Sequence, residues 1–247
     1  MVLTKYLAGA VILLLLITSL SLWFLPASVV WRGLEADQHL PYGARVTLPR
    51  GTIREGNATL RFRTFPPSKL SWTLTSLFPD ERSLALKYQV RLEGPNHTVD
   101  ANVSLQKSGF NLMSVSGFFD SEDINQLAAP FGHQFSGRVD INLQDIRWNP
   151  QCVEKATGQI DWTGGTVSLN LFEKLTIYQL PAMTGNITET TCGLTVNLER
   201  NRQTLGQFTL TSEGWFRASI EPSLLRLAKT PNADQIKQPL LFEEKIL

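Results

Sequence analysis

The sequence lacks a charge excess of either sign, with 23 Lys and Arg residues against 22 Asp and Glu residues over 247 positions. It also lacks runs of like charge and low-complexity tracts. A protein that binds nucleic acid needs a basic surface that displaces the counterions of the phosphate backbone. The even balance therefore predicts no nucleic-acid partner, and it argues against a domain that is held on anionic membranes by charge.

The sequence contains none of the short motifs that mark common catalytic or nucleotide sites, such as H-E-x-x-H, G-x-S-x-G or a Walker loop. Its three histidines, His39, His97 and His133, are far apart in the chain, and we expect each of them in a solvated turn. Glu122 and Asp123 are explained by the start of a helix, where acidic side chains are favoured. We therefore predict a protein that is not an enzyme, with no catalytic residues, no metal site and no cofactor.

Cysteine is scarce, and the only two copies are Cys152 and Cys192. In an oxidising compartment such a pair is expected to form a disulfide. Closing a loop of about 40 residues would stabilise the fold by about 4 kcal/mol in the chain-entropy model. Two separate buried thiols are the alternative interpretation. Neither cysteine has a second Cys or a His close by, so the spacing does not indicate a metal site.

A long apolar run is present near the amino terminus. Residues 6–25, YLAGAVILLLLITSLSLWFL, contain no charge, Pro, Asn or Gln, and as a helix they would reach about 30 Å, the thickness of a bilayer core. Lys5 and the amino terminus favour a cytoplasmic leader over residues 1–5, so the chain from residue 26 onward would lie across the membrane. A cleaved signal peptide would share this orientation, but its apolar region is usually shorter and ends at an A-x-A pattern. We therefore predict an uncleaved transmembrane helix.

From Val46 onward, apolar and polar residues alternate, a pattern typical of half-buried strands. About a dozen such segments predict a mainly β protein with an antiparallel, curved sheet. The parity of the alternation changes after Leu143, which indicates a bulge near Gln144-Asp145. The pattern leaves open whether the sheet closes into a barrel, splits into a sandwich or forms an open trough.

The organisation of the rest follows from helix and turn signals. Acidic residues in a first turn predict a short central helix over residues 121–129, and Pro222 begins a second, weaker helix. We expect a loop from Trp31 to Pro49 and a break at Pro66-Pro67. The predicted β domain covers residues 26–228, with possible related halves at 34–120 and 134–220, and residues 229–247 form a polar, loosely held tail.

Three tryptophans, Trp72, Trp148 and Trp162, share an apolar-polar-Trp pattern within expected strands. Tryptophans in strands most often belong to a core. If the sheet is open and concave, the same side chains would line a binding face for an apolar or polypeptide ligand.

Several short motifs, in this order and spacing, resemble the type II secretion system protein N family of the general secretion pathway. They are VTLPRGTIREGNA from Val46, LSWTL from Leu70, FSGRVDI from Phe135, ATGQIDWTGG from Ala156, CGL from Cys192 and EGWFR from Glu213. The resemblance implies an inner-membrane component of a machine that exports folded proteins from the periplasm through the outer membrane. It transfers no catalytic residue to this chain.

Two functions follow as expectations. The first is a single-pass inner-membrane protein with a cytoplasmic amino terminus and a periplasmic β domain, which binds other type II secretion subunits through strand edges or an apolar concave face. The alternative is a membrane-tethered β-groove protein that binds or transfers lipid in the cell envelope.

Overall fold

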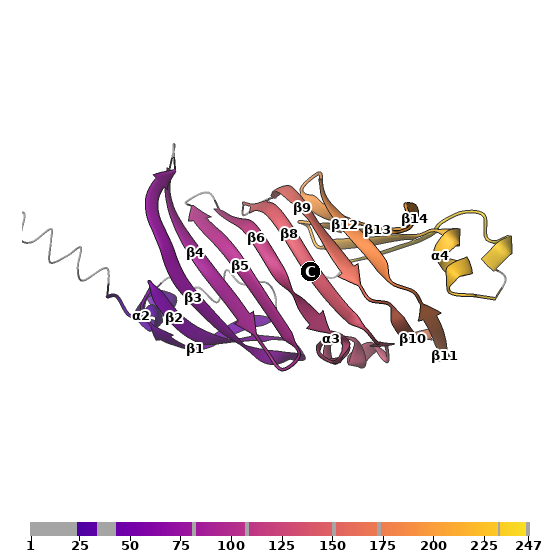
Figure 1. Cartoon of the computed structure of the whole chain (residues 1–247), viewed down its shortest axis with the longest axis horizontal. Helices are drawn as coiled ribbons and strands as arrows, with labels where there is room; N and C mark the ends of the chain where they lie inside the picture. The colour runs from indigo at the N-terminus through magenta and orange to yellow at the C-terminus, as the bar shows by residue number, and fades with distance from the viewer. Residues whose placement is uncertain are drawn as a thin grey trace, which may run out of the picture.

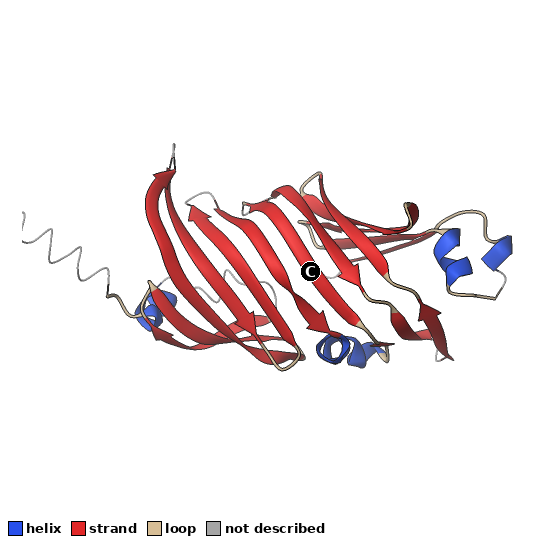
Figure 2. Ribbon diagram, viewed as in Figure 1, coloured by secondary structure: helices blue, strands red, loops and turns tan. Residues whose placement is uncertain are grey.

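The structure is a computed structural model that describes residues 24–33, 43–80, 83–106, 109–149, 152–171, 174–231 and 233–245. Strands account for most of these residues, and the helices lie at the margins (Figure 2). A 13-stranded sheet and a 3-stranded sheet make up the molecule, and every strand pair in them is antiparallel. The prediction of a mainly β, antiparallel, curved sheet is confirmed.

In the large sheet, strands that follow one another in the sequence lie side by side (Figure 1). In spatial order, its strands are β1 (Ala44–Gly51), β2 (Glu55–Phe62), β3 (Phe65–Asp80), β4 (Ser83–Glu93), β5 (His97–Gln106), β6 (Gly109–Asp120), β8 (Arg138–Trp148), β9 (Val153–Trp162), β12 (Met183–Thr190), β13 (Gly193–Arg200), β14 (Gln203–Thr211), β15 (Trp215–Ile220) and β16 (Leu240–Lys245). The small sheet contains β11 (Lys174–Leu180), β10 (Gly165–Leu171) and β7 (Gln134–Phe135). The exceptions to the sequential order of the large sheet are the pairs β6–β8 and β9–β12, because the strands between them in the sequence belong to the small sheet.

Short helices mark the ends and the middle of the chain that the structure describes. They are α2 (Ala27–Gly33), α3 (Ser121–Ala128), the 3-10 turn η2 (Ala129–Phe131), α4 (Pro222–Leu227) and the 3-10 turn η3 (Ala233–Gln235). Helix α3 confirms the predicted central helix, and α4 begins at Pro222 as predicted. Strands β6 and β8 pair directly across α3, so the large sheet continues from one predicted half into the other.

Three local expectations were wrong. The loop expected from Trp31 to Pro49 is replaced at both ends, because α2 extends to Gly33 and β1 begins at Ala44. Strand β3 begins at Phe65 and continues through Pro66-Pro67, because the prolines lie where the β2–β3 register shifts and before the β3–β4 ladder, which starts at Lys69. The expected loose tail contains β16, which pairs with β15 from Trp215 to Ile220.

The predicted transmembrane segment at residues 6–25 lies outside the described residues, apart from Phe24 and Leu25. Among the residues that are described, no helix has both the length and the apolar composition needed to cross a bilayer.

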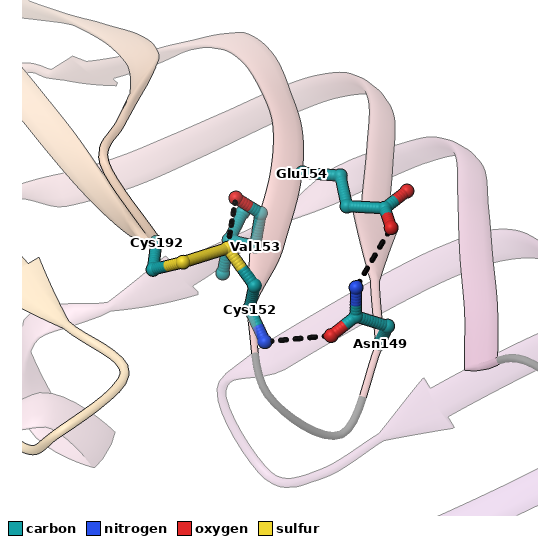
Figure 3. Close-up of a disulfide and its surroundings, with 5 residues drawn as sticks. All are labelled: Asn149, Cys152, Val153, Glu154 and Cys192. Atoms are coloured by element: carbon teal, nitrogen blue, oxygen red, sulfur yellow. Dashed lines mark hydrogen bonds between the residues drawn. A yellow bond between two sulfur atoms is a disulfide. The ribbon is translucent and has the colours of Figure 1, made fainter.

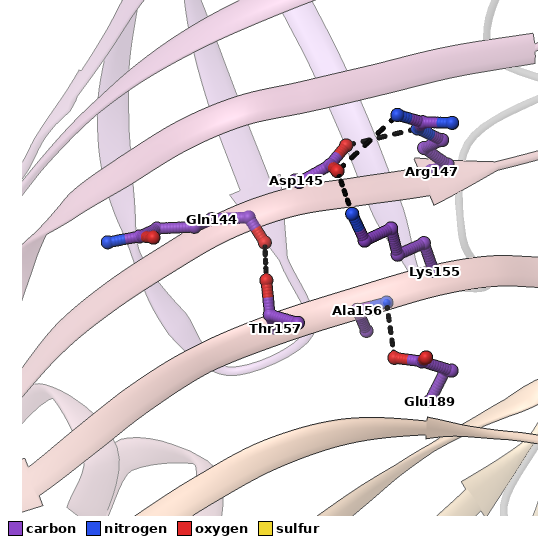
Figure 4. Close-up of polar contacts among 7 residues, drawn as sticks. All are labelled: Gln144, Asp145, Arg147, Lys155, Ala156, Thr157 and Glu189. Carbon is purple, nitrogen blue, oxygen red and sulfur yellow. Dashed lines mark hydrogen bonds and ion pairs between the residues drawn. The ribbon is translucent and has the colours of Figure 1, made fainter.

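The predicted bulge in β8 is confirmed. The β8–β9 register shifts between Gln144 and Arg147, and Asp145 adopts a φ of 50°. The Asp145 carboxylate accepts hydrogen bonds from Lys155 Nζ at 2.5 Å and from Arg147 Nε at 3.0 Å (Figure 4). The hydrogen bond from Lys155, helped by Arg147, holds the pKa of Asp145 below its usual value. The bulge restores the parity of β8, so Ile146 returns to the face that carries Leu143.

Candidate functional site

The two faces of the large sheet differ in chemistry along its whole width. Directly opposed residues in neighbouring strands lie on the same face. One row crosses the sheet from β2 to β16 and consists only of apolar residues and glycine: Gly56, Trp72, Val90, Ala101, Val115, Leu143, Gly158, Ile187, Val196, Phe208, Ala218 and Phe242. We call the surface that contains this row the apolar face.

The neighbouring row, one residue along each strand, is polar until its last member. It consists of Asn57, Ser71, Arg91, Asp100, Ser116, Asn142, Gln159, Asn186, Asn197, Gln207, Ser219 and Leu241. We call this side the polar face. Leu241 is therefore the one apolar member of a polar row, and its side chain is 78% exposed.

The helices cover the apolar face only in part. Helix α2 contacts β1, α3 contacts β3, β6 and β7, and α4 contacts β14. In the middle, Ile146, Val153, Ala156 and Ile187 form a buried cluster. Beyond it, the rings of Phe110 and Trp148 stack with centroids 6.0 Å apart, and Trp148 remains 40% exposed. An incompletely covered apolar face is typical of a surface that binds another molecule.

An apolar groove of about 330 Å³ lies on this face beside α2. Helix α2 contributes Trp31, β3 contributes Trp72, β4 contributes Tyr88, and β5 contributes Val103 and Leu105. The Trp72 indole N–H donates to the backbone oxygen of Thr52 at 3.0 Å, so it does not need a ligand as its acceptor. Burial raises the pKa of the Tyr88 hydroxyl. The groove is therefore suited to bind an apolar group.

At another end of the apolar face, three polar side chains form a buried network. His97 Nδ1 donates to Asp123 Oδ2 at 2.6 Å, and Nε2 lies 2.8 Å from Ser68 Oγ. Asp123 also accepts from the backbone N–H and the side-chain amide of Asn96, each at 3.2 Å. The rings of Phe65 and Phe119 flank the imidazole, with centroids 4.9 and 5.4 Å away. The network joins α3 to β3 and to the turn between β4 and β5.

The connectivity is that of a Ser-His-Asp relay, in which a histidine links a hydroxyl to a carboxylate. A nucleophile must also reach a substrate carbonyl, but Ser68 is only 2% exposed and Asp123 is fully buried. The one proton of the Ser68 hydroxyl is donated to the carbonyl oxygen of Pro66 at 3.1 Å, so it is not directed at His97 Nε2 as a relay requires. This arrangement holds α3 against the sheet, and the Ser68 hydroxyl is not accessible at the surface. Buried polar groups that are fully hydrogen-bonded stabilise one arrangement of the elements they join.

The expectation that all histidines lie in solvated turns was therefore wrong for His97, which is 1% exposed. Asp123 lies in the first turn of α3 as predicted, but its carboxylate also points into the network. One sequence signal could have identified His97: it continues the alternation of Val99 and Ala101, which places it on the apolar face. His133 follows η2, and His39 lies outside the described residues.

The three tryptophans singled out in the sequence all lie on the apolar face, but they do not meet. Trp72 lines the groove, whereas Trp148 and Trp162 are the last residues of the antiparallel strands β8 and β9 and so lie at opposite ends of them. The Trp162 indole donates to the backbone oxygen of Ser136 at 3.0 Å. The sequence signal that was missed is Trp31, which joins Trp72 in the groove.

Cys152 and Cys192 form the expected disulfide (Figure 3). It links the segment before β9 to the turn between β12 and β13, two neighbouring regions of the sheet. Asn149 orders this segment, because its side-chain oxygen accepts from the Cys152 backbone N–H at 2.7 Å and its amide donates to Glu154 at 2.7 Å. On the adjacent strands, Glu189 accepts from the Ala156 backbone N–H at 3.3 Å (Figure 4).

Within the described ranges, no group of three or more His, Cys, Asp or Glu side chains is placed to hold a metal ion. Candidate binding surfaces on the described part of the chain are the apolar face with its groove and the exposed edge strand β16.

The sequence was compared with protein families, with curated proteins and with solved structures. The family model for protein N of the type II secretion system matches residues 43–242, which includes β1 and reaches into β16. No curated protein and no solved structure matches the chain. Because the family model covers most of the sequence and nearly all of the sheet, the chain belongs to the type II secretion system protein N family.

Proposed function

We propose that this secretion component acts without catalysis, as a membrane-anchored subunit that binds other subunits of the type II machine. In this proposal residues 6–25 anchor the chain in the bacterial inner membrane, with residues 1–5 in the cytoplasm and the β domain in the periplasm. The family supplies the secretion pathway, and the apolar composition of residues 6–25 supports the anchor.

The observation that carries the proposal is the open edge of the sheet at β16. Among the strands that the structure describes, it pairs with β15 alone, and each of its six residues is exposed. It contains no proline and no bulge, and it presents Leu241 and Phe242 on opposite faces, 78% and 58% exposed. An exposed, regular edge strand that is apolar from Leu240 to Phe242 offers unpaired N–H and C=O groups to a strand of another chain.

The opposite edge of the same sheet is protected. Strand β1 contains Pro49, which has no N–H to donate. Next to it, Leu48 has a φ of 55° and the β1–β2 register shifts between Thr47 and Arg50. Irregularities of this kind prevent the addition of a further strand. The contrast between the two edges selects β16 as the docking strand.

Paired variants at the two edges test this proposal. Leu241→Glu places a charge on the exposed face of β16, and Leu48→Glu makes the same change at the protected edge, where the side chain is 67% exposed. Each full-length variant would replace the natural protein in its host, followed by purification of the complex and measurement of a secreted substrate. We expect Leu241→Glu to reduce the recovery of sibling secretion subunits, while Leu48→Glu leaves it unchanged.

Two results would contradict the proposal. One is normal recovery of the sibling subunits with Leu241→Glu, which would remove β16 as the docking strand. The other is normal export from a host that lacks the protein, with no secretion subunit purifying alongside it, which would remove the secretion role itself.

The apolar face supports a second candidate, a membrane-tethered protein that binds lipid. A specific observation favours it: the groove beside α2 is lined by apolar side chains from five elements and from the turn before β2. Strand docking at β16 does not use this groove, since the two sites lie on strands at different ends of the sheet.

A further inference from the structure

We propose that the groove beside α2 binds a single acyl chain of a membrane lipid. This inference rests on the second candidate function and is independent of docking at β16. The volume of the groove, about 330 Å³, falls at the lower end of the usual range of ligand pockets, roughly 300 to 1,000 Å³. That volume suits one slender apolar chain.

The chemistry of the lining excludes a charged ligand group. None of the lining residues that the structure describes carries a charge, and the walls are formed by aliphatic and aromatic side chains such as Val90, Val103 and Leu105. The Trp72 N–H already has Thr52 as its acceptor. Moving a charged headgroup into such surroundings without a partner costs several kcal/mol, so the headgroup stays outside and only the chain enters.

The geometry also argues against a polypeptide in the groove. The groove lies on a side-chain face of the sheet, between α2 and strands β3 to β5, whose backbone groups are already paired in the ladder. An extended peptide there would bury N–H and C=O groups with nothing to bond them. A second helix, about 10 Å across with its side chains, needs more room than the groove offers. A hydrocarbon chain has no such groups to satisfy.

The position of the groove indicates where the acyl chain would come from. Helix α2 begins at Ala27, directly after the apolar run of residues 6–25, and its residues Ala27, Val30 and Trp31 form one wall. If the apolar run spans the bilayer, the groove is within one short helix of the membrane surface. A lipid in the outer leaflet of the inner membrane would then be the nearest apolar ligand.

Cross-linking in a membrane tests the proposal. The full-length protein would be reconstituted in liposomes of phosphatidylethanolamine and phosphatidylglycerol that contain a phosphatidylcholine with a photoreactive diazirine near the end of one acyl chain. After illumination, cross-linked peptides are mapped by mass spectrometry. We expect adducts on the lining segments of β3, β4 and β5, in addition to adducts on residues 6–25.

Two variants make the result specific. Leu105→Glu adds a charge to the groove at a side chain that is already 42% exposed, so the fold can accommodate the change. Ile177→Glu makes the same change on β11, outside the groove, where the side chain is 64% exposed. We expect Leu105→Glu to reduce groove adducts about tenfold, because an acyl chain in the groove would have to displace water from the new carboxylate, and Ile177→Glu to leave them unchanged. Circular dichroism would verify that both variants keep their strand content.

The outcomes separate the site from the broader function. Groove adducts that are lost only in Leu105→Glu support the proposal. Adducts confined to the apolar face of β8 to β13 would overturn the groove as the site and leave lipid binding by the sheet in place. Adducts confined to residues 6–25 would overturn both. None of these results depends on secretion subunits, so docking at β16 is tested separately.

Discussion

The buried carboxylate of Asp123 is predicted to hold α3 on the sheet. It accepts from His97 Nδ1 at 2.6 Å and from two N–H groups of Asn96 at 3.2 Å, and it is completely shielded from solvent. Asp123→Ala would remove all three contacts and leave His97 Nδ1 and the Asn96 backbone N–H without their acceptor, while His97 Nε2 keeps its contact with Ser68. Each buried group left unpaired costs about 1 to 3 kcal/mol. Because two such groups would be left, we expect a loss of about 4 kcal/mol.

Hydrogen exchange of the full-length protein in detergent micelles, followed by mass spectrometry, measures this loss where it occurs. Amides of α3 and of the strands beside the β4–β5 turn should exchange about a hundredfold faster or more, because each 1.4 kcal/mol corresponds to a factor of ten. Amides of β12 to β15 should change little, since the network does not reach them.

The matched control is Glu122→Ala, in the same first turn of α3 but with an exposed side chain. It should cost only about 0.3 to 1 kcal/mol, the contribution of an acidic side chain near a helix amino terminus. Equal exchange rates in the two variants would refute the reasoning, because the buried network would then contribute no more than a surface carboxylate. A uniform acceleration across the whole sheet would show that the network controls global unfolding and does not act as a local fastening.

Four further outcomes are expected. Cys152→Ser should reduce the free energy of unfolding by about 4 kcal/mol, seen as a lower thermal midpoint that added reductant does not lower further. Hydrogen bonds hold the pKa values of Asp145 and Glu189 below normal, so their contribution to stability is present above about pH 4 and is lost as the pH falls through the lowered values. The thermal midpoint of the double variant Asp145→Asn, Glu189→Gln should therefore fall less steeply with acid than that of the natural protein. Gly94→Ala should destabilise the β4–β5 turn in hydrogen exchange, because the added Cβ would overlap the imidazole ring beneath it. A fluorophosphonate probe should not label Ser68 in the folded protein, and labelling that Ser68→Ala abolishes would show that the relay opens to substrate.

Local sequence patterns were sufficient for most of the strands. Period-two alternation located β4, β5 and β8, and the change of parity after Leu143 identified the bulge at Asp145 before any coordinates. These features depend on neighbours within a few residues, which the sequence displays directly. The same alternation carried the information that His97 faces inward, but the adjacent turn signal at Gly94-Pro95-Asn96 led to the opposite interpretation.

The remaining features depend on contacts between distant segments. Ser68 and Asp123 lie 29 and 26 residues from His97, and no spacing rule brings them together. The sequence of β16 shows little alternation, and the segment is a strand because it pairs with the edge of β15. Helix α2 is too short for a helical period to show, and its place depends on β1. Tertiary contact decides such elements, so their prediction required the fold.

The bulges explain how one face stays apolar across so many strands. A slip of one residue in any ladder would turn every later side chain to the opposite face. Register shifts occur between Leu74 and Ser76, between Asn102 and Val103, and between Gln144 and Arg147, and after each shift the apolar row resumes on the original side. Each bulge leaves a residue outside the ladder, which is a local cost. A sheet that only needed to pair its strands would gain nothing from this correction, whereas a sheet that keeps one continuous apolar face across its strands requires it.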